Sequence, residues 1–550
     1  MQSETKQCQN CKNDFVIESD DFAFYEKMKA PTPNYCWECR MQRRLAHRNE
    51  RTLYRRVCDA SGKSIISIYP ENTPWPVYET KEWWKDTWGG EDFGQEYNPT
   101  KPFFDQWIEL RNKVPRMALL SLNSVNSEYT NNAGHNKNCY LIFASDNNED
   151  SMYSKFIHYC RNVTDCAYLF KSENCYECVD CHSCTNCIFS EHCYSSVDLM
   201  FCYDCRDCQD CILSNNLRHK KYMINNIQYT KEQYEDKKRE ILKGYSSIKK
   251  AKDDFLKIKE SVIQKFAFLT KCENVIGDYL NNCYDSRFLF DVGDAKDCAY
   301  IADSQQPKDC YDCNNIYHSP EMYLDVMSSL QCKNVKYSSH IFTSTDLEYC
   351  DNCHSSSNLF GCIGLRNKKY CILNIQYTKE EYEKLKKEII ENMKKEKVYG
   401  DFLPPETSSF GYNESLANEY WVLNKDEALK MGYNWQDNVT GMYGKETIYN
   451  DDIPDSILDV DESILNEIFK DEVTGQNFRI TKQELEFYKR FNLPLPRLSF
   501  DTRHQNRVEK RNPRKLYKRT TEDGVEVMTP YSPDRPEKIY SEEGYNKLIY

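Results

Sequence analysis

The chain has 550 residues and a mass of 65.3 kDa, which is too long for one compact core and corresponds to roughly three or four structural units. Hydrophobic residues make up only 40% of it, and no stretch approaches the ~20 apolar residues of a membrane-spanning helix. The net charge of −13 argues against a protein that coats nucleic acid along its whole length. Residues 1–7 lack the basic and apolar regions of a secretory signal, so we expect a cytoplasmic protein without a membrane partner.

Cysteine and tyrosine are unusually abundant, with 28 and 41 residues. The cysteine share, near 5%, is below that of a small disulfide scaffold. In a reducing compartment these thiols are expected to bind metal or to be buried rather than to form disulfides.

Residues 1–57 contain two CxxC pairs about 25 residues apart. Each pair can form a tight turn that directs two thiolates at one ion, and two pairs complete a tetrahedral site. We therefore predict one Zn²⁺ held by Cys8, Cys11, Cys36 and Cys39. A site with four protein ligands leaves no position for a reacting water, so its role is expected to be structural.

The same segment resembles the zinc-ribbon family with the pattern CxxC…F…FY…P…CxxCR. The residues that carry this resemblance are Cys8, Cys11, Phe15, Phe24, Tyr25, Pro33, Cys36, Cys39 and Arg40. The next segment, 58–137, is interpreted as a degenerate second CxxC module and a connector. It retains only Cys58 of the expected cysteines, so no metal is predicted there.

A cysteine repeat dominates residues 138–228. The thirteen cysteines between Cys139 and Cys211 are separated by multiples of three, and several recur after 27 residues, for example Cys175 with Cys202 and Cys184 with Cys211. Repeats of this kind indicate a solenoid, and the absence of an apolar 3.6-residue pattern favours stacked extended coils, a parallel β-solenoid. Asn or Asp often precedes the cysteine, which is typical of tight corners.

The unit recurs at 266–377, where the segment 365–380 repeats 217–232 at an offset of 148 residues. The cysteine phase changes once, so we predict a single insertion between Cys313 and Cys332. Each solenoid is expected to end in a capping helix, at 229–265 and 378–397. Thr230 with Gln233 and Thr378 with Glu381 form capping-box patterns at the starts of these helices.

Two interpretations of the central cysteines remain open. Small thiols can fill a narrow solenoid interior, or they can form a thiolate cluster that binds zinc or iron–sulfur. Residues three apart on an extended chain lie ~10 Å apart, which favours packing.

After an acidic linker at 398–470, the segment 471–550 begins as a degenerate copy of the N-terminal module. A shift of 463 residues aligns 8–56 with 471–519 without a gap. The four metal ligands become Asp471, Thr474, Ser499 and Thr502, so the copy is expected to fold without metal.

Both modules end in an arginine-rich tail, and arginines of one tail align with arginines of the other. Segments 40–56 and 503–519 carry net charges of +6 and +7, which suits phosphate binding. The alternative is that these cations pair with acidic residues of the same chain, for example in 451–472. The candidate phosphate ligands are Arg40, Arg44, Arg51, Arg56, Arg503, Arg507, Arg514 and Arg519.

Over nearly its whole length the chain is similar to a family of uncharacterised, cysteine-rich bacterial proteins from small-genome lineages. The similarity includes the N-terminal ribbon, the cysteine triplets, Phe410–Glu414 and Leu495–Arg497. Members often carry the CoA-transferase label CaiB/BaiF, which we do not adopt because nothing here alternates as βαβ units.

These patterns predict a mainly β protein with helices. It comprises a zinc ribbon, two solenoid-like cysteine-rich regions each closed by a helix, and a metal-free ribbon copy. We expect a non-enzymatic zinc-binding scaffold that contacts RNA or a ribonucleoprotein. The alternatives are a metal- or redox-handling protein that uses the central cysteines, and a carbohydrate-active β-solenoid whose tyrosines line a groove.

Overall fold

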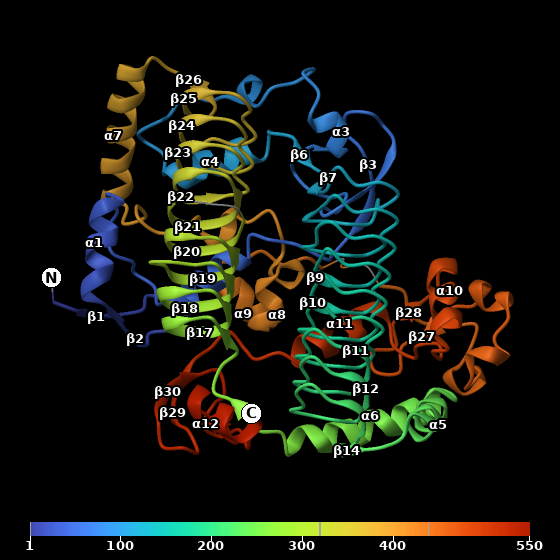
Figure 1. Cartoon of the computed structure of the whole chain (residues 1–550). Coiled ribbons are helices and arrows are strands. Elements are labelled where there is room, and N and C mark those ends of the chain that lie inside the picture. Colours follow the sequence, from blue (N-terminus) through green and yellow to red (C-terminus); the bar gives the residue numbers. More distant parts are fainter. Residues whose placement is uncertain (1, 318–320, 438, 440) are drawn as a thin grey trace.

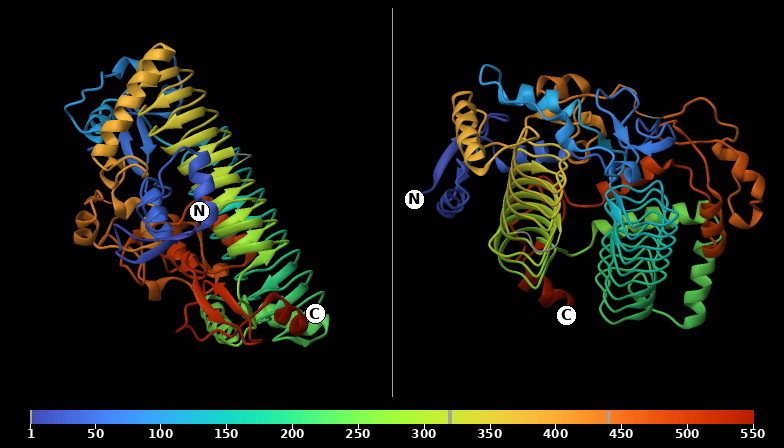
Figure 2. Two further views of the ribbon diagram at one scale, coloured as in Figure 1. Left: turned by 90° about the vertical axis from the view of Figure 1, so that its left-hand side faces the viewer. Right: turned by 90° about the horizontal axis from the view of Figure 1, so that it is seen from above.

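The structure is a computed structural model that describes residues 2–317, 321–437, 439 and 441–550. Two parallel β-solenoids lie side by side and run in opposite directions (Figure 1). Both views of Figure 2 show that most of the remaining segments lie on one side of the two columns. Among the described residues, every helix is too short or too polar to span a lipid bilayer.

Solenoid 1 begins at residue 121, earlier than the predicted boundary at 138, because coils without cysteine precede Cys139. Most of its coils are joined by isolated bridges and short strands. Its strands are β7 Ser121–Leu122, β8 Ala133–Gly134, β9 Lys155–His158, β10 Ala167–Phe170, β11 Val197–Met200, β12 Gln209–Ile212, β13 Lys221–Ile224 and β14 Ile227–Gln228.

Solenoid 2 forms one eleven-stranded sheet. Its strands are β16 Leu269–Thr270, β17 Glu273–Asn281, β18 Tyr284–Gly293, β19 Ala299–Gln305, β20 Lys308–Tyr317, β21 Glu321–Leu330, β22 Lys333–Ser339, β23 Thr345–Glu348, β24 Ser357–Phe360, β25 Lys369–Ile372 and β26 Ile375–Gln376. The partners shift from 12 to 13 residues apart between β20 and β21, so one residue is inserted, as predicted. It falls beside residues 318–320, which lie outside the described residues.

Most coils contain 12 residues, and the predicted 27-residue stacking is therefore wrong. Tyr176 pairs with Ile188, and Leu199 pairs with Cys211, each 12 positions later. Every triplet supplies one inward-pointing residue. Two residues separated by any multiple of three therefore both point inward, whatever the coil length. Residues 27 apart are two coils and one corner apart, and they lie on adjacent sides rather than in one column.

The corners explain the triplet. From Asn132 to Asn225, φ is positive at every third residue, including Asn138, Asp165 and Asp180 at 54°, 53° and 52°. Asn and Asp adopt this left-handed conformation more readily than most residues, which confirms the interpretation of the residues before cysteine. The residue that follows each corner points inward, and Cys178, Cys181 and Cys184 are fully buried there.

The capping boxes are present, but the first cap is a pair of helices rather than one. The segment predicted as a linker also contributes Phe402, Leu403 and Tyr412 to the largest hydrophobic core. The helices of these two regions are α5 Lys231–Ile241, α6 Tyr245–Glu260, α7 Lys379–Lys395, α8 Ala417–Tyr420 and α9 Lys425–Lys430.

The two terminal segments contain matching elements. The N-terminal segment has β1 Glu4–Gln7, β2 Asp14–Ile17, α1 Ser19–Lys27, α2 Trp37–Leu45, β3 Tyr54–Val57, β4 Ser64–Ser67, β5 Val77–Tyr78, α3 Thr80–Trp83, α4 Phe103–Arg111 and β6 Arg116–Met117. The C-terminal segment has β27 Phe469–Lys470, β28 Asn477–Phe478, α10 Lys482–Phe491, α11 Phe500–Glu509, β29 Tyr517–Thr520, β30 Glu526–Thr529, β31 Ile539–Tyr540 and α12 Glu542–Ile549. Strand β15 Gln264–Lys265 pairs with β31, as β6 pairs with β5.

Candidate functional site

The four N-terminal cysteines converge. Cys8 follows β1, Cys36 caps the N-terminus of α2, and the four sulfur atoms all lie within 4.8 Å of one another. Lys12, at φ 64°, makes the tight turn that brings Cys11 back beside Cys8. Hydrogen bonding with the Cys39 thiol lowers the pKa of Cys36 to about 5. This group could hold one metal ion.

The cysteines inside the solenoids do not form a second group of this kind among the described residues. Their thiols instead donate to backbone carbonyls of the next coil, as Cys178 does to Cys187 at 3.2 Å. Burial raises the pKa of Cys139 and Cys160 to about 11, so these thiols are protonated at neutral pH. The geometry favours packing over a metal cluster.

In the C-terminal copy, a hydrogen-bond network links the four positions that align with the cysteines. The Asp471 carboxylate accepts from the backbone N–H groups of Thr474, at 2.8 Å, and Ser499, at 2.5 Å. The Ser499 and Thr502 hydroxyls lie 3.2 Å apart. One carboxylate therefore ties together the two turns that the metal ligands occupy in the N-terminal module.

The N-terminal arginines are buried against solenoid 2. Arg40 donates to Asp312 at 2.7 Å, and Arg44, which is fully buried, donates to Asp325 at 2.7 Å. The remaining two candidates do not contact solenoid 2 carboxylates: the half-buried Arg51 pairs with Asp501 of α11 at 2.7 Å, and Arg56 pairs with Asp59 at 2.9 Å.

The C-terminal arginines are buried mainly against solenoid 1. Arg503 and Arg507 both donate to Asp165, at 3.2 and 2.9 Å. Arg514 pairs with Asp291 and Asp303 of solenoid 2. Arg519 donates to backbone carbonyls at positions 532 and 537.

These contacts argue against the phosphate interpretation of the tails and favour the alternative of pairing within the chain. Guanidinium groups that are buried and hydrogen-bonded to carboxylates or backbone carbonyls are not available to a nucleic acid. Most of the partner carboxylates belong to the solenoids, not to the 451–472 stretch suggested by its charge. The acidic solenoid corners and the basic tails are complementary surfaces of one folded unit.

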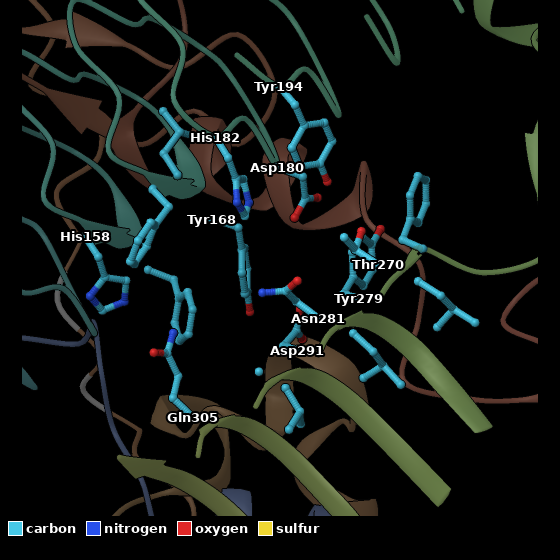
Figure 3. A pocket seen from close by; sticks show the side chains of 18 of the residues that line it. His158, Tyr168, Asp180, His182, Tyr194, Thr270, Tyr279, Asn281, Asp291 and Gln305 are labelled. Carbon is cyan, nitrogen blue, oxygen red and sulfur yellow. The ribbon is translucent and has the colours of Figure 1, made fainter. Parts of the chain in front are cut away.

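A cleft of about 590 Å³ lies between the solenoids. Figure 3 shows side chains of solenoid 1, among them His158, Tyr168, His182 and Tyr194, facing Tyr279, Asn281 and Gln305 of solenoid 2. Five residues spaced by 12 form a ladder along one wall. They are His158, Phe170, His182, Tyr194 and Arg206, and neighbouring members lie 4.9–6.4 Å apart, between ring centres or from the guanidinium carbon to the ring centre.

Arg511 lines the cleft and contacts both of its walls. Its guanidinium lies between the rings of Tyr168 and Tyr279, at 3.4 and 3.9 Å from the ring centres. It donates to Asp180 of solenoid 1 at 2.9 Å and to Asp291 of solenoid 2 at 2.6 Å. This single side chain therefore joins the two solenoids.

The cleft has little net charge. Its basic residues are Arg206, Lys265 and Arg511, and its acidic residues are Asp180, Asp207, Asp291 and Asp294. Burial lowers the pKa of His158 and of His182 to about 4, so both are neutral at pH 7. His158 is 7% exposed, and its Nε2 has no hydrogen-bond partner among the described residues.

The cleft residues were not among the residues predicted from the sequence. The pattern that could have revealed the ladder is the 12-residue spacing of its members, which the 27-residue period concealed. Arg511 aligns with Arg48 at the 463-residue offset, but only the fold brings Asp180 and Asp291 together around it.

Comparisons with known proteins do not assign this site. No protein-family profile matches the chain, and no curated protein matches it significantly. Among solved structures, one match is to a protein described as an acetyltransferase from Desulfovibrio desulfuricans G20, at 12% identity and a TM-score of 0.11. The match covers 44% of this chain and 63% of that one, and similarity at this level says nothing about function.

Proposed function

We propose that this protein is a non-enzymatic binding protein whose cleft between the solenoids holds a saccharide. The observation that carries the proposal is the ladder of ring side chains, which faces amide side chains across a neutral cleft. A sugar has an apolar C–H face that packs on aromatic rings and hydroxyl groups that exchange hydrogen bonds at its edge.

The other residues of the cleft fit the same ligand. Asn281 and Gln305, two coils apart on solenoid 2, offer both donors and acceptors. The neutral His158, with its unpartnered Nε2, can exchange one more hydrogen bond with a hydroxyl group. A cleft of about 590 Å³ is within the usual range of small-ligand sites.

Binding is favoured over catalysis because the two most buried carboxylates of the cleft are already engaged. Asp180 and Asp291 both accept hydrogen bonds from Arg511. Although burial raises the pKa of Asp291, Arg511 and Arg514 hold it below its usual value. Burial raises the pKa of Asp180 to about 6 in spite of Arg511, but the hydrogen bonds to Arg511 occupy both carboxylates.

The N-terminal metal fits this role as a structural element. Four thiolates in a closed set are the ligands of a structural zinc ion, and we infer that Zn²⁺ occupies the site. The segment that it organises places Arg40 and Arg44 on solenoid 2. The metal would thus help hold the solenoid whose amide side chains form the second wall of the cleft.

The test is a binding screen of neutral oligosaccharides against the full-length, metal-loaded protein, followed by calorimetric titration of the best ligand. Phe170→Ala and Tyr194→Ala should each weaken binding by about tenfold, the equivalent of ~1.4 kcal/mol. Tyr284→Ala, a solenoid tyrosine that does not line the cleft, is the matched control and should bind like the wild type. Equal affinities for all four proteins, or no binding in the screen, would exclude the proposal.

A further inference from the structure

A second cavity, of about 580 Å³, lies on the other side of solenoid 1, where α6 and the segment 494–498 approach it. Its floor is apolar and includes the buried side chains of Phe189, Phe201, Phe255 and Leu495. Lysines from α6 and the end of α11 stand around it together with Glu177, Glu191 and Glu509, so an apolar floor meets a charged rim.

Most of these lysines are neutralised within the protein. Lys252 pairs with Glu177 at 2.9 Å, and Lys259 and Lys510 pair with Glu191 at 2.5 and 3.4 Å. Lys249 also lines the cavity, is exposed, and forms no ion pair among the described residues.

Arg497 is buried but forms no ion pair with a carboxylate among the described residues, whereas the buried Arg40, Arg44, Arg503, Arg507 and Arg514 each form one. It is 5% exposed, and its Nη2 donates to the backbone carbonyls of Ile453 and Pro454 at 2.9 and 3.4 Å. Its guanidinium lies 4.7 Å from the centre of the Tyr245 ring, and its Nη1 has no partner among the described residues. A buried cation in this state is costly unless an anion reaches it.

The other half of the protein shows that this arrangement is not required by the fold. Tyr337 and Tyr349, the counterparts of Phe189 and Phe201 at the 148-residue offset, are covered by Tyr399, whose ring centre lies 6.2 Å from each. Asn34, the counterpart of Arg497, is satisfied by Asp401 at 2.9 Å. Between solenoid 1 and the C-terminal segment, a cavity and an unpaired cation occupy the corresponding place.

We propose that this cavity binds an amphiphilic carboxylate, with its apolar chain on the phenylalanine floor and its carboxylate at Arg497 and Lys249. A carboxylate can accept two parallel hydrogen bonds from a guanidinium group, which would satisfy Nη1. The chain would lie against the buried Phe189 and Phe201 and replace water on the exposed Leu256. This site is separate from the saccharide cleft.

The test is calorimetric titration of the full-length, metal-loaded protein with decanoate, decanol and decyltrimethylammonium. Decanoate should bind at one site per chain and at least tenfold more tightly than either other probe. Arg497→Met should lower its affinity by at least tenfold, whereas Arg490→Met, an exposed arginine of α10 outside the cavity, should have no effect.

Lys249→Glu keeps the test decisive if Arg497→Met destabilises the module, because Lys249 is exposed. It should weaken decanoate several-fold and strengthen decyltrimethylammonium. Phe170→Ala, in the saccharide cleft, should leave decanoate binding unchanged, so the two proposals can fail independently. Absence of decanoate binding, equal affinities for decanoate and decanol, or indifference to Lys249→Glu would overturn the proposal.

Discussion

The guanidinium group of Arg40 lies 4.9 Å from the centre of the Tyr300 ring. At the 463-residue offset, Arg503 lies 5.0 Å from the ring of Tyr153, which precedes Tyr300 by 147 residues. Each tyrosine hydroxyl also donates to an acidic residue of the terminal module that packs against it. Tyr300 donates to Asp21, and Tyr153 donates to Glu484. The chain is a duplication whose contacts are crossed, because the N-terminal module packs on solenoid 2 and the C-terminal module on solenoid 1.

Removal of one partner from the buried cluster around Asp165 should be strongly destabilising. Arg507→Met leaves Asp165 with a weaker set of donors in a fully buried position, and we expect a loss of about 3–5 kcal/mol in the free energy of unfolding. Lys137→Met, which breaks the exposed pair with Glu149, should cost no more than about 1 kcal/mol. Urea titration compares the two, and equal losses would show that the buried pairs do not hold the halves together.

Metal removal should loosen only one end of the chain. Elemental analysis should find one zinc per chain, and either a chelator or Cys36→Ser should increase amide hydrogen exchange in residues 4–45. Residues 471–509 should keep their protection because Asp471 replaces the metal with hydrogen bonds. Loss of protection at both ends would contradict the independence of the two modules.

Low pH should loosen the C-terminal module through Asp471. Against a raising effect of burial, hydrogen bonds from the backbone at Thr474 and Ser499 lower the pKa of Asp471 to about 2. Because the unfolded value is about 3.9, this carboxylate stabilises the folded state above that pH. The contribution disappears as the pH falls through about 2. Hydrogen exchange of residues 471–509 should therefore rise between about pH 4 and 2 in the wild type. A shallower rise is expected in Asp471→Asn, and an identical profile would refute the assignment.

Thiol reactivity should follow burial. Of the 28 cysteines, only Cys11, Cys36 and Cys272 are exposed or half-buried. With metal bound to the first two, iodoacetamide should label Cys272 first, aided by a pKa that hydrogen bonding with Cys283 lowers to about 6. The solenoid cysteines should react only on unfolding. Mass spectrometry of labelled peptides measures the order, and early labelling of Cys181 or Cys193 would mean that the solenoid interior is open.

Local features of the fold were predictable because they depend on neighbouring residues. Asn and Asp before cysteine indicated the left-handed corners, the capping-box patterns located two helix starts, and the CxxC pairs indicated the four converging cysteines. The coil length was not predictable from the cysteines alone, since a triplet keeps every third residue inward for any number of corners per turn.

Contacts across the duplication were harder to foresee. The sequence showed that Arg503 and Arg507 match Arg40 and Arg44, but charge alone does not distinguish a phosphate from Asp165 more than 300 residues away. The cleft depends on a further long-range fact, that the solenoids run side by side in opposite directions. Only this arrangement places Tyr168 and Tyr279 on either side of Arg511.

The central claim is that the arginine tails hold the fold together while the cleft binds a neutral ligand. A paired salt titration tests it most directly. The affinity of the wild type for its best oligosaccharide and for single-stranded RNA would be followed from low to high salt. The account predicts saccharide binding that does not change with salt, and no RNA binding attributable to the arginine tails. RNA binding with a log–log salt slope of roughly −3, reduced by substitution of Arg40, Arg44, Arg51 and Arg56, would contradict it.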